Sequence, residues 1–223
     1  MPPPRLRVSA VSGRVTIVGE DRDDVSIDPE GEQELHEDGS IEVKPHRRSS
    51  SVRVRCPEGT EVMVGTVSGN VDLEGSLGAV RVTSRSGSIT VDTVESADLR
   101  TVSGKTKVER CTGLCRISTT SGTIVVGDAG GGDVATVSGR VRIGATSGVE
   151  VRTVSGKVDV QSGAQGPVRV KTISGSIDVT LPQGVRPKVL AKGRGKVRCD
   201  CEEGNDVDVD VRTVSGKIEI AAR

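Results

Sequence analysis

One tetrapeptide, Thr-Val-Ser-Gly or a close variant, recurs along almost the whole sequence. Successive Ser-Gly glycines are 18, 17, 18, 17, 17 and 19 residues apart. These glycines are Gly69, Gly87, Gly104, Gly122, Gly139, Gly156 and Gly175. Gly13 and Gly216 extend the series toward the two ends, and degenerate copies surround Gly39 and Gly195. A fixed period of this length is typical of repeat architectures, so about ten copies of one structural unit are expected.

Each copy has the apolar alternation of two β-strands. In the segment "GVEVRTVSGKVDV" (148–160), Val149 and Val151 alternate with charged residues, and the parity of this alternation changes after Thr153. Strict alternation indicates strands with one buried face, and a change of parity indicates a corner between them. The pattern predicts the corner at Thr153–Val154, with Val154 and Gly156 facing inward. The 49 Val and Ile residues against 8 Leu also favour strands.

Stacking such copies predicts an all-β fold, a single parallel β-solenoid (β-helix) of about ten coils of 17–19 residues. It would occupy residues 1–223 as one domain. Residues 1–65 would form irregular N-terminal coils and a cap, 66–180 the regular coils, and 181–223 the degenerate and final coils. Equivalent residues would form columns about 4.8 Å apart. The Thr hydroxyls would bond to the backbone at the bend. Glycine would be needed either because only a small residue fits between the inward Val columns or because the bend needs an unusual dihedral.

The repeated T-V-S-G-x-V-x-V resembles the bacterial putative-adhesin family of β-strand-repeat domains, a domain of unknown function. The opening "RVSAVSGRVTIVGEDRDDVSI" and the segment "VRVRCPEGTEVMVGTVSG" share the resemblance, which covers essentially the whole chain. It implies an adhesin-like role, and some relatives are associated with envelope-stress signalling at the cell surface. It implies no catalytic or binding residues.

Composition excludes several classes of partner. Lys plus Arg and Asp plus Glu number 31 each, and the chain has no Phe, Tyr or Trp. A neutral chain without aromatic residues lacks the clustered cations and stacking platforms that nucleic acids require, so no nucleic acid partner is expected. No apolar run reaches the roughly 20 residues of a membrane span, and the N-terminus lacks a signal-peptide pattern. A cytoplasmic location is expected, with surface or envelope association as the alternative.

Motifs that could carry catalysis are better explained by the repeat. The segment Leu99–Thr106 ends in Gly-Lys-Thr, but a phosphate-binding loop needs glycine where Leu99 stands. The serines lack the Gly-x-Ser-x-Gly context of a hydrolase nucleophile. The two histidines, His36 and His46, both lie in the irregular N-terminal stretch. No catalytic or cofactor-binding residues are therefore expected, and the chain is predicted not to be an enzyme.

Cysteine and aspartate clusters are interpreted as structural, so no metal ligands and no cofactors are expected. Cys115 and Cys199 each have the parity of inward positions, as does Cys56, and free Cys packs as a small hydrophobe. This interpretation competes with zinc binding by the two pairs Cys111/Cys115 and Cys199/Cys201. The aspartates of "NDVDVDVR", namely Asp206, Asp208 and Asp210, are predicted on a solvated outer face. The segment Asp128–Asp133 is predicted as a flexible turn.

These observations predict a non-enzymatic scaffold or protein-interaction module, adhesin-like. The alternative is a cell-envelope stress sensor or surface adhesin that presents outward side-chain columns to a ligand. The partner would be another protein or a second copy, because the sequence ends on the repeat strand "TVSGKIEIAAR" with no evident cap. Self-association through this C-terminal coil is therefore expected. The charged residues at about 20–50 would cover the other end.

Overall fold

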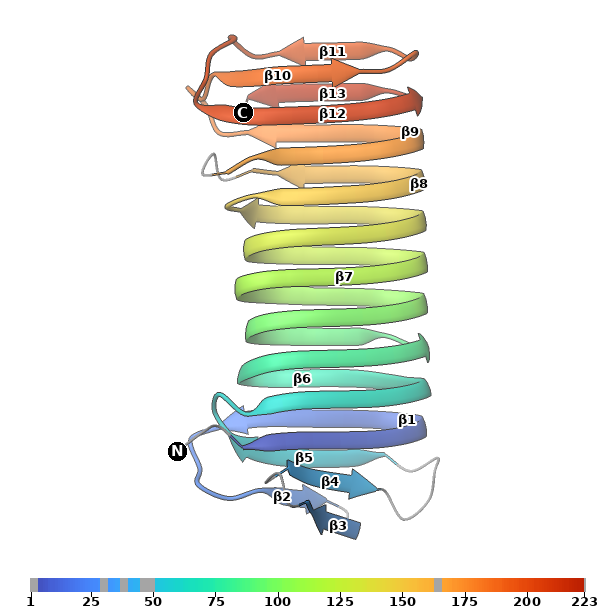
Figure 1. Ribbon diagram of the computed structural model, residues 1–223, viewed down its shortest axis with the longest axis vertical. Coiled ribbons are helices and arrows are strands. Elements are labelled where there is room, and N and C mark those ends of the chain that lie inside the picture. The colour runs from blue at the N-terminus through green and yellow to red at the C-terminus, as the bar shows by residue number, and fades with distance from the viewer. Residues whose placement is uncertain (1–3, 29–31, 37–39, 45–50, 163–165, 223) are drawn as a thin grey trace. The chain divides into compact units, whose positions relative to one another are not determined.

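The computed structural model describes residues 4–28, 32–36, 40–44, 51–162 and 166–222 (Figure 1). All regular structure in these residues is β, which confirms the predicted all-β class. The strands are β1 (Arg5–Glu20), β2 (Ser26–Asp28), β3 (Glu32–Leu35), β4 (Ser40–Lys44), β5 (Val52–Pro57), β6 (Glu61–Ser86), β7 (Ile89–Thr146), β8 (Val149–Gln161), β9 (Val168–Leu181), β10 (Pro187–Lys192), β11 (Val197–Asp200), β12 (Val207–Ser215) and β13 (Ile218–Ala222). None of the described residues forms a helix that is long and apolar enough to span a bilayer.

The chain divides into two compact units, Met1–Thr112 and Gly113–Arg223. In the first unit, β1 pairs in parallel with β6, and β6 pairs in parallel with the beginning of β7. The opposite edge of β1 pairs with β4 and then with β5. Two short strands complete this edge in antiparallel fashion, because β2 pairs with β5 and β3 pairs with β4. The first strand of the sequence is thus enclosed between strands on both sides.

The degenerate repeat predicted around Gly39 contributes its strand to a different half of the winding than expected. Gly39 itself lies outside the described residues, but the Ser40–Lys44 strand pairs with Arg5–Val8. Those residues of β1 precede the Ser-Gly corner at Gly13, whereas the prediction placed "SIEV" after a corner. Strand β5 occupies the position after the corner, because it pairs with Val15–Glu20.

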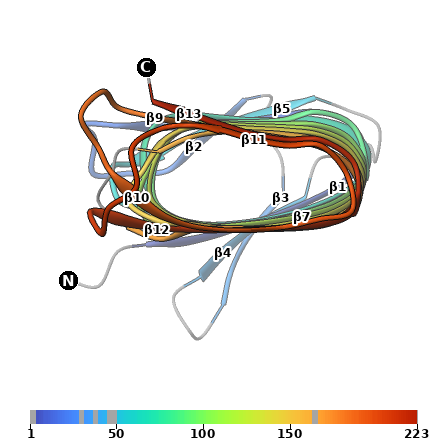
Figure 2. The same cartoon turned by 90° about the horizontal axis from the view of Figure 1, so that it is seen from above.

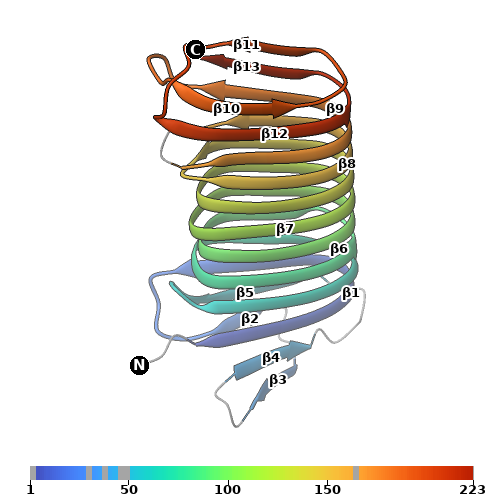
Figure 3. The same cartoon turned by 45° about the horizontal axis from the view of Figure 1, so that its top comes forward.

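In the second unit, β7, β8 and β9 pair in parallel with repeats in register, so Thr136, Thr153 and Thr172 are adjacent. Figure 2 shows the windings of β8 and β9 overlying one another. Strands β12 and β13 then pair with β9, and β10 and β11 pair with β12 and β13 (Figure 3). The final strands of the sequence therefore lie inside the stack, and β10 and β11 form its edge.

This order corrects the prediction of self-association through the C-terminal coil. Both edges of β12 and of β13 are already occupied, by β9 on one side and by β10 or β11 on the other. The exposed edge belongs to the degenerate copy, whose strand β10 begins with Pro187 and carries Lys188 and Lys192. Proline and lysine at an edge are devices that discourage further strand pairing.

The interior consists of columns of aliphatic side chains. Val141, Val158, Ile177 and Ile218 are paired neighbours in successive windings of the second unit, and all are at most 2% exposed. The segment Asp128–Asp133, predicted as a flexible turn, is part of β7, and Ala129 within it is buried. The alternation is interrupted there, because the inward position changes from Val126 to Ala129 and then to Val134. A change of parity of this kind indicates a corner.

The corner of the repeat is one residue later than predicted. Thr153 is buried and Val154 is exposed, whereas the prediction turned the chain at this pair and directed Val154 inward. The inward series Val149, Val151 and Thr153 is continuous, and it resumes at Val158. The chain therefore turns at Val-Ser-Gly, and threonine is the last inward residue of its strand.

Glycine is required at this corner for two reasons. Gly156 has φ +135°, in the left-handed region that L side chains rarely adopt. A Cβ on Gly156 would also overlap the carbonyl oxygen of Gly139 in the preceding winding. Gly175 stands in the same relation to Gly156, and Gly216 to Gly175. The predicted unusual dihedral at the corner glycine is confirmed.

We expect Gly156→Ala to lower the free energy of unfolding by about 2–4 kcal/mol, because it adds both backbone strain and a clash with Gly139. Gly131→Ala is the matched control within the second unit. Its added Cβ would meet only Leu114 Cδ1 at 3.9 Å, an ordinary contact. Its effect should stay within about 0.5 kcal/mol. Urea unfolding of both variants measures the difference, and equal losses would contradict the role assigned to the corner.

Six of the buried threonines that precede a corner donate a hydroxyl hydrogen bond to the carbonyl oxygen two residues later, in agreement with the predicted bond to the backbone. Thr153 Oγ1 donates to the Ser155 carbonyl oxygen at 3.1 Å. The same bond is made by Thr101, Thr119, Thr136, Thr172 and Thr213. Thr66 occupies the equivalent position in the first unit, but its buried hydroxyl has no hydrogen-bond partner among the described residues.

Replacement by valine should therefore have opposite effects at two equivalent positions of the repeat. Thr153→Val removes a hydrogen bond while keeping the shape, and we expect a loss of about 1 kcal/mol. Thr66→Val removes a buried hydroxyl without a partner, and we expect a gain of about 1 kcal/mol. Thermal and urea unfolding of the two single variants would measure both effects. A comparable loss in the two variants would show that the Thr66 hydroxyl is satisfied in solution.

Candidate functional site

Most of the Ser-Gly corners expose one β-branched apolar residue, although Arg85 and Thr120 take this position at two of them. In the second unit these are Val137, Val154, Ile173 and Val214, which we call the valine ridge. They are exposed by 48%, 44%, 53% and 54%, respectively. Because the preceding threonines pair across neighbouring windings, the four side chains occupy consecutive positions of one column. Contiguous exposed apolar residues on a protein surface mark interaction sites.

Cations occupy the columns on both sides of the valine ridge. One column precedes the buried threonine and the other follows the corner glycine. Three of the four positions in each column are exposed cations, which are Arg152, Lys171 and Arg212 in the first and Arg140, Lys157 and Lys217 in the second. Ala135 and Ser176 take the remaining positions. The apolar ridge is thus enclosed between two positively charged columns.

Carboxylates lie one column further out and pair with these cations. Lys157 Nζ lies 2.7 Å from Asp178 Oδ2, and Lys217 pairs with Glu219. The hydrogen bond that Lys157 donates to Asp178 raises the pKa of Lys157, and the hydrogen bond that Lys217 donates to Glu219 lowers the pKa of Glu219. Both interactions favour the charged forms. Outward from the ridge, the surface therefore changes from apolar to basic to acidic.

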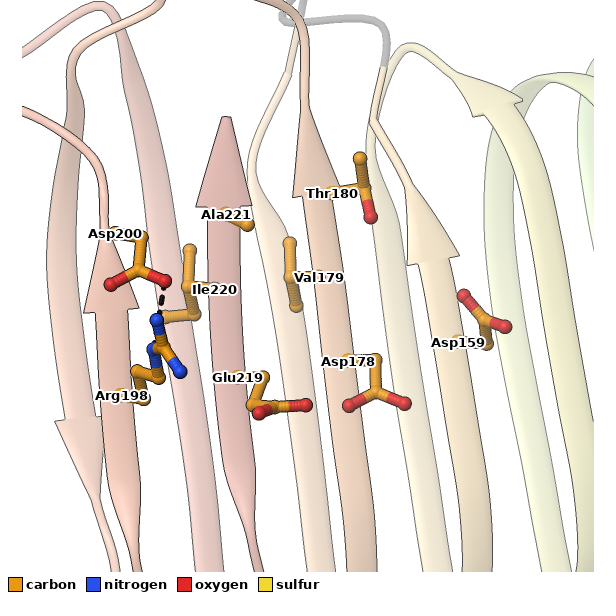
Figure 4. Close-up of a pocket in the computed structure, with 9 residues that line it drawn as sticks. All are labelled: Asp159, Asp178, Val179, Thr180, Arg198, Asp200, Glu219, Ile220 and Ala221. Carbon is orange, nitrogen blue, oxygen red and sulfur yellow. Dashed lines mark hydrogen bonds and ion pairs between the residues drawn. The ribbon is translucent and has the colours of Figure 1, made fainter. Parts of the chain in front are cut away.

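A shallow hollow of about 350 Å³ lies among the outer carboxylates near the end of the second unit. Figure 4 shows Asp159, Asp178 and Glu219 side by side, from β8, β9 and β13. Arg198 of β11 pairs with Asp200 at 2.8 Å at one end of the hollow. Each of the three carboxylates is paired with a cation. Asp159 Oδ2 lies 3.8 Å from Arg142 Nε, and Asp178 and Glu219 pair with Lys157 and Lys217 as described above. The hollow is therefore a surface ladder of ion pairs, each contributing little to stability.

The motifs considered as phosphate or calcium sites belong to the repeat. Leu99 and Thr106, at the two ends of the Gly-Lys-Thr segment, are both buried in the interior of the first unit. Asp206 and Asp208 are exposed, as predicted for a solvated outer face. Asp206 pairs with Arg186, and Asp210 pairs with Arg212 at 2.8 Å.

The cysteines divide into buried and exposed groups. Cys56, Cys111 and Cys115 are buried, which confirms the predicted core role of Cys56 and Cys115. The same prediction is wrong for Cys199, which is exposed. Cys199 pairs with Ile220 and so belongs to an inward column, but β11 lies at the edge of the stack, where no further winding covers it.

Cys199 also lies beside Cys201. Their Sγ atoms are 2.8 Å apart. Burial, and then the hydrogen bond with Cys199, raises the pKa of Cys201 to about 12. The nucleophilic form of cysteine is the thiolate, which is scarce for Cys201 at neutral pH. The arrangement at Cys201 is therefore unlike that of an activated catalytic cysteine.

Comparison with known proteins agrees with the repeat architecture. The model of the family described as Toastrack DUF4097 matches residues 6–222. The chain belongs to this family. The resemblance found in the sequence is thereby confirmed, and the family is one of unknown function.

Two further comparisons were made, with curated proteins and with solved structures. No curated protein matches the chain. A putative cell adhesion protein from Clostridium sporogenes ATCC 15579, of known structure, is 14% identical. That match covers 99% of this chain and 93% of the other, with a TM-score of 0.23. The candidate site is therefore argued from the geometry of this chain alone.

Sequence reasoning missed the valine ridge and one polar cluster. The ridge was missed because Val154 was assigned inward, although the unbroken alternation through Thr153 indicates that threonine is the inward residue. The cluster consists of Glu34, His36 and Glu42, which lie close together in the first unit. The spacing of the repeat does not predict that these residues meet, because it is the antiparallel pairing of β3 with β4 that brings them together.

Proposed function

We propose that this chain is a non-enzymatic, adhesin-like β-solenoid of about ten coils that binds a protein partner. The observation that carries the proposal is the valine ridge, with four consecutive apolar side chains exposed by 44–54%. Contact of such a column with water is unfavourable. A partner that covers the column is bound more tightly in proportion to the apolar area that is removed from water. The ridge lies on strands held on both sides, which keeps its shape fixed for binding.

The flanking charges specify the chemistry of the partner. A complementary surface would present an apolar strip between two rows of carboxylates, which would face Arg152 and Lys171 on one side and Arg140 and Lys157 on the other. A second copy docked ridge against ridge would instead place cations opposite cations, which costs free energy. The charge pattern therefore favours a different protein over self-association through this surface.

The distribution of titratable groups supports a binding role rather than catalysis. In the hollow near the end of the second unit, Asp159, Asp178 and Glu219 are each paired with a cation at the surface. Cys201 is held largely as the neutral thiol. A catalytic acid or base needs a pKa matched to its task in a site that excludes water, and neither group meets this description.

We expect binding to depend on the ridge and not on neighbouring outward positions. A photo-reactive amino acid at position 173 should crosslink to a protein different from this chain in the native cell. Val154→Asp should reduce that crosslink about tenfold or more, because it places a charged carboxylate against the apolar strip of the partner. Asp208→Asn, at an exposed position away from the corner, is the matched control and should leave the crosslink unchanged.

Three results would contradict this proposal. They are the absence of a crosslink at position 173, a crosslink only to a second copy of the chain, and equal effects of Val154→Asp and Asp208→Asn. Because Val154 is already exposed, its substitution should leave the unfolding transition unchanged, and circular dichroism provides that check. The double change Arg152→Glu with Lys157→Glu tests the charge pattern separately and should also weaken the crosslink.

For location we propose the cytoplasm, with an envelope sensor or surface adhesin as the second candidate. The same exposed ridge would serve either role, so location has to be measured directly. Protease treatment of intact native cells, with lysed cells as the control, separates the two. Protection until lysis supports the cytoplasmic scaffold, and cleavage on intact cells supports the surface role.

A further inference from the structure

Three side chains with metal-binding groups meet where β3 and β4 pair in the first unit. Glu34 and His36 are two residues apart, so in an extended chain they lie on the same face. Glu42 is directly opposite Glu34 in the antiparallel register. The backbone N–H of His36 donates to the Ser40 carbonyl oxygen at 2.9 Å, which continues the pairing beyond the end of β3. The local fold therefore fixes all three residues relative to one another.

The donor atoms are close enough for one ion. The imidazole nitrogen and the two carboxylate oxygens all lie within 4.8 Å of one another, and His36 Nε2 is 3.1 Å from Glu42 Oε2. In a tetrahedral site, two ligands at about 2.0–2.2 Å from a zinc ion are about 3.3–3.6 Å apart. The most widely separated donors would have to approach by about 1 Å, and a change of rotamer of the exposed Glu34 side chain can supply this.

Electrostatics and burial favour a cation at this place. Like charges directly opposite each other on one face of an antiparallel pair are destabilising by about 0.2–1 kcal/mol, and Glu34 and Glu42 are such a pair. The Glu42 side chain is 16% exposed and that of His36 is 35% exposed, so both are partly withdrawn from water. A divalent ion bound between the two carboxylates would offset their mutual repulsion.

We propose that Glu34, His36 and Glu42 form a binding site for a divalent transition-metal ion of the zinc type. Imidazole nitrogen with carboxylate oxygen suits such ions, whereas calcium and magnesium prefer all-oxygen ligands. Three protein ligands leave a coordination position for water. Strand β4 pairs with β1 over Arg5–Val8, so the ion would fasten the β3–β4 hairpin at the edge of the first unit.

The test is calorimetric titration of the full chain with zinc chloride. Every titration uses the background Cys199→Ser with Cys201→Ser, because the adjacent thiols of those residues could themselves bind zinc. We expect one ion per chain, with Glu42→Gln and His36→Gln each weakening binding tenfold or more. His46→Gln, which changes the other histidine of the sequence, is the matched control and should bind as the background does.

A second readout separates binding from misfolding. Zinc should slow amide exchange in β3 and β4 of the background protein and should not do so in the Glu42→Gln variant, while exchange in β8 and β9 stays the same in both. The proposal is overturned if no ion binds with a Kd below about 1 mM. It is equally overturned if binding and exchange are unaffected by His36→Gln and Glu42→Gln.

Discussion

The close approach of successive windings at the Ser-Gly corner governs the rest of the structure. The carbonyl oxygen of each corner glycine occupies the space that a Cβ on the next one would need, as between Gly139 and Gly156. This contact keeps equivalent residues of successive windings in register, and register is what converts a repeated sequence into columns. The buried threonines, the aliphatic interior and the valine ridge all depend on that alignment.

Features that arise within one copy could be predicted from the sequence. The all-β class, the inward aliphatic columns and the corner dihedral all follow from alternation and from the conformational freedom of glycine. The error of one position at the corner has a physical cause, because Val154 is apolar and has the same parity as the inward Val158 and Val160. Only Thr153 of the Thr-Val pair lies inside, and its hydroxyl is satisfied by the carbonyl oxygen of Ser155.

Features that depend on the order of strands in space could not be predicted in this way. Cys199 has inward parity and is still exposed, because β11 lies at the edge although its copy is not the last in the sequence. Residues 40–44 were aligned to the wrong half of the repeat for a similar reason. The cluster of Glu34, His36 and Glu42 depends on antiparallel pairing, which the parallel repeat does not suggest.

The placement of β12 and β13 inside the stack determines how the second unit resists force. A tether at the end of the chain would pull on strands that are hydrogen-bonded along both edges, to β9 on one side and to β10 and β11 on the other. Such a load cannot peel β12 or β13 away from an edge by breaking one hydrogen bond at a time. Two ladders must shear together before such a strand is released.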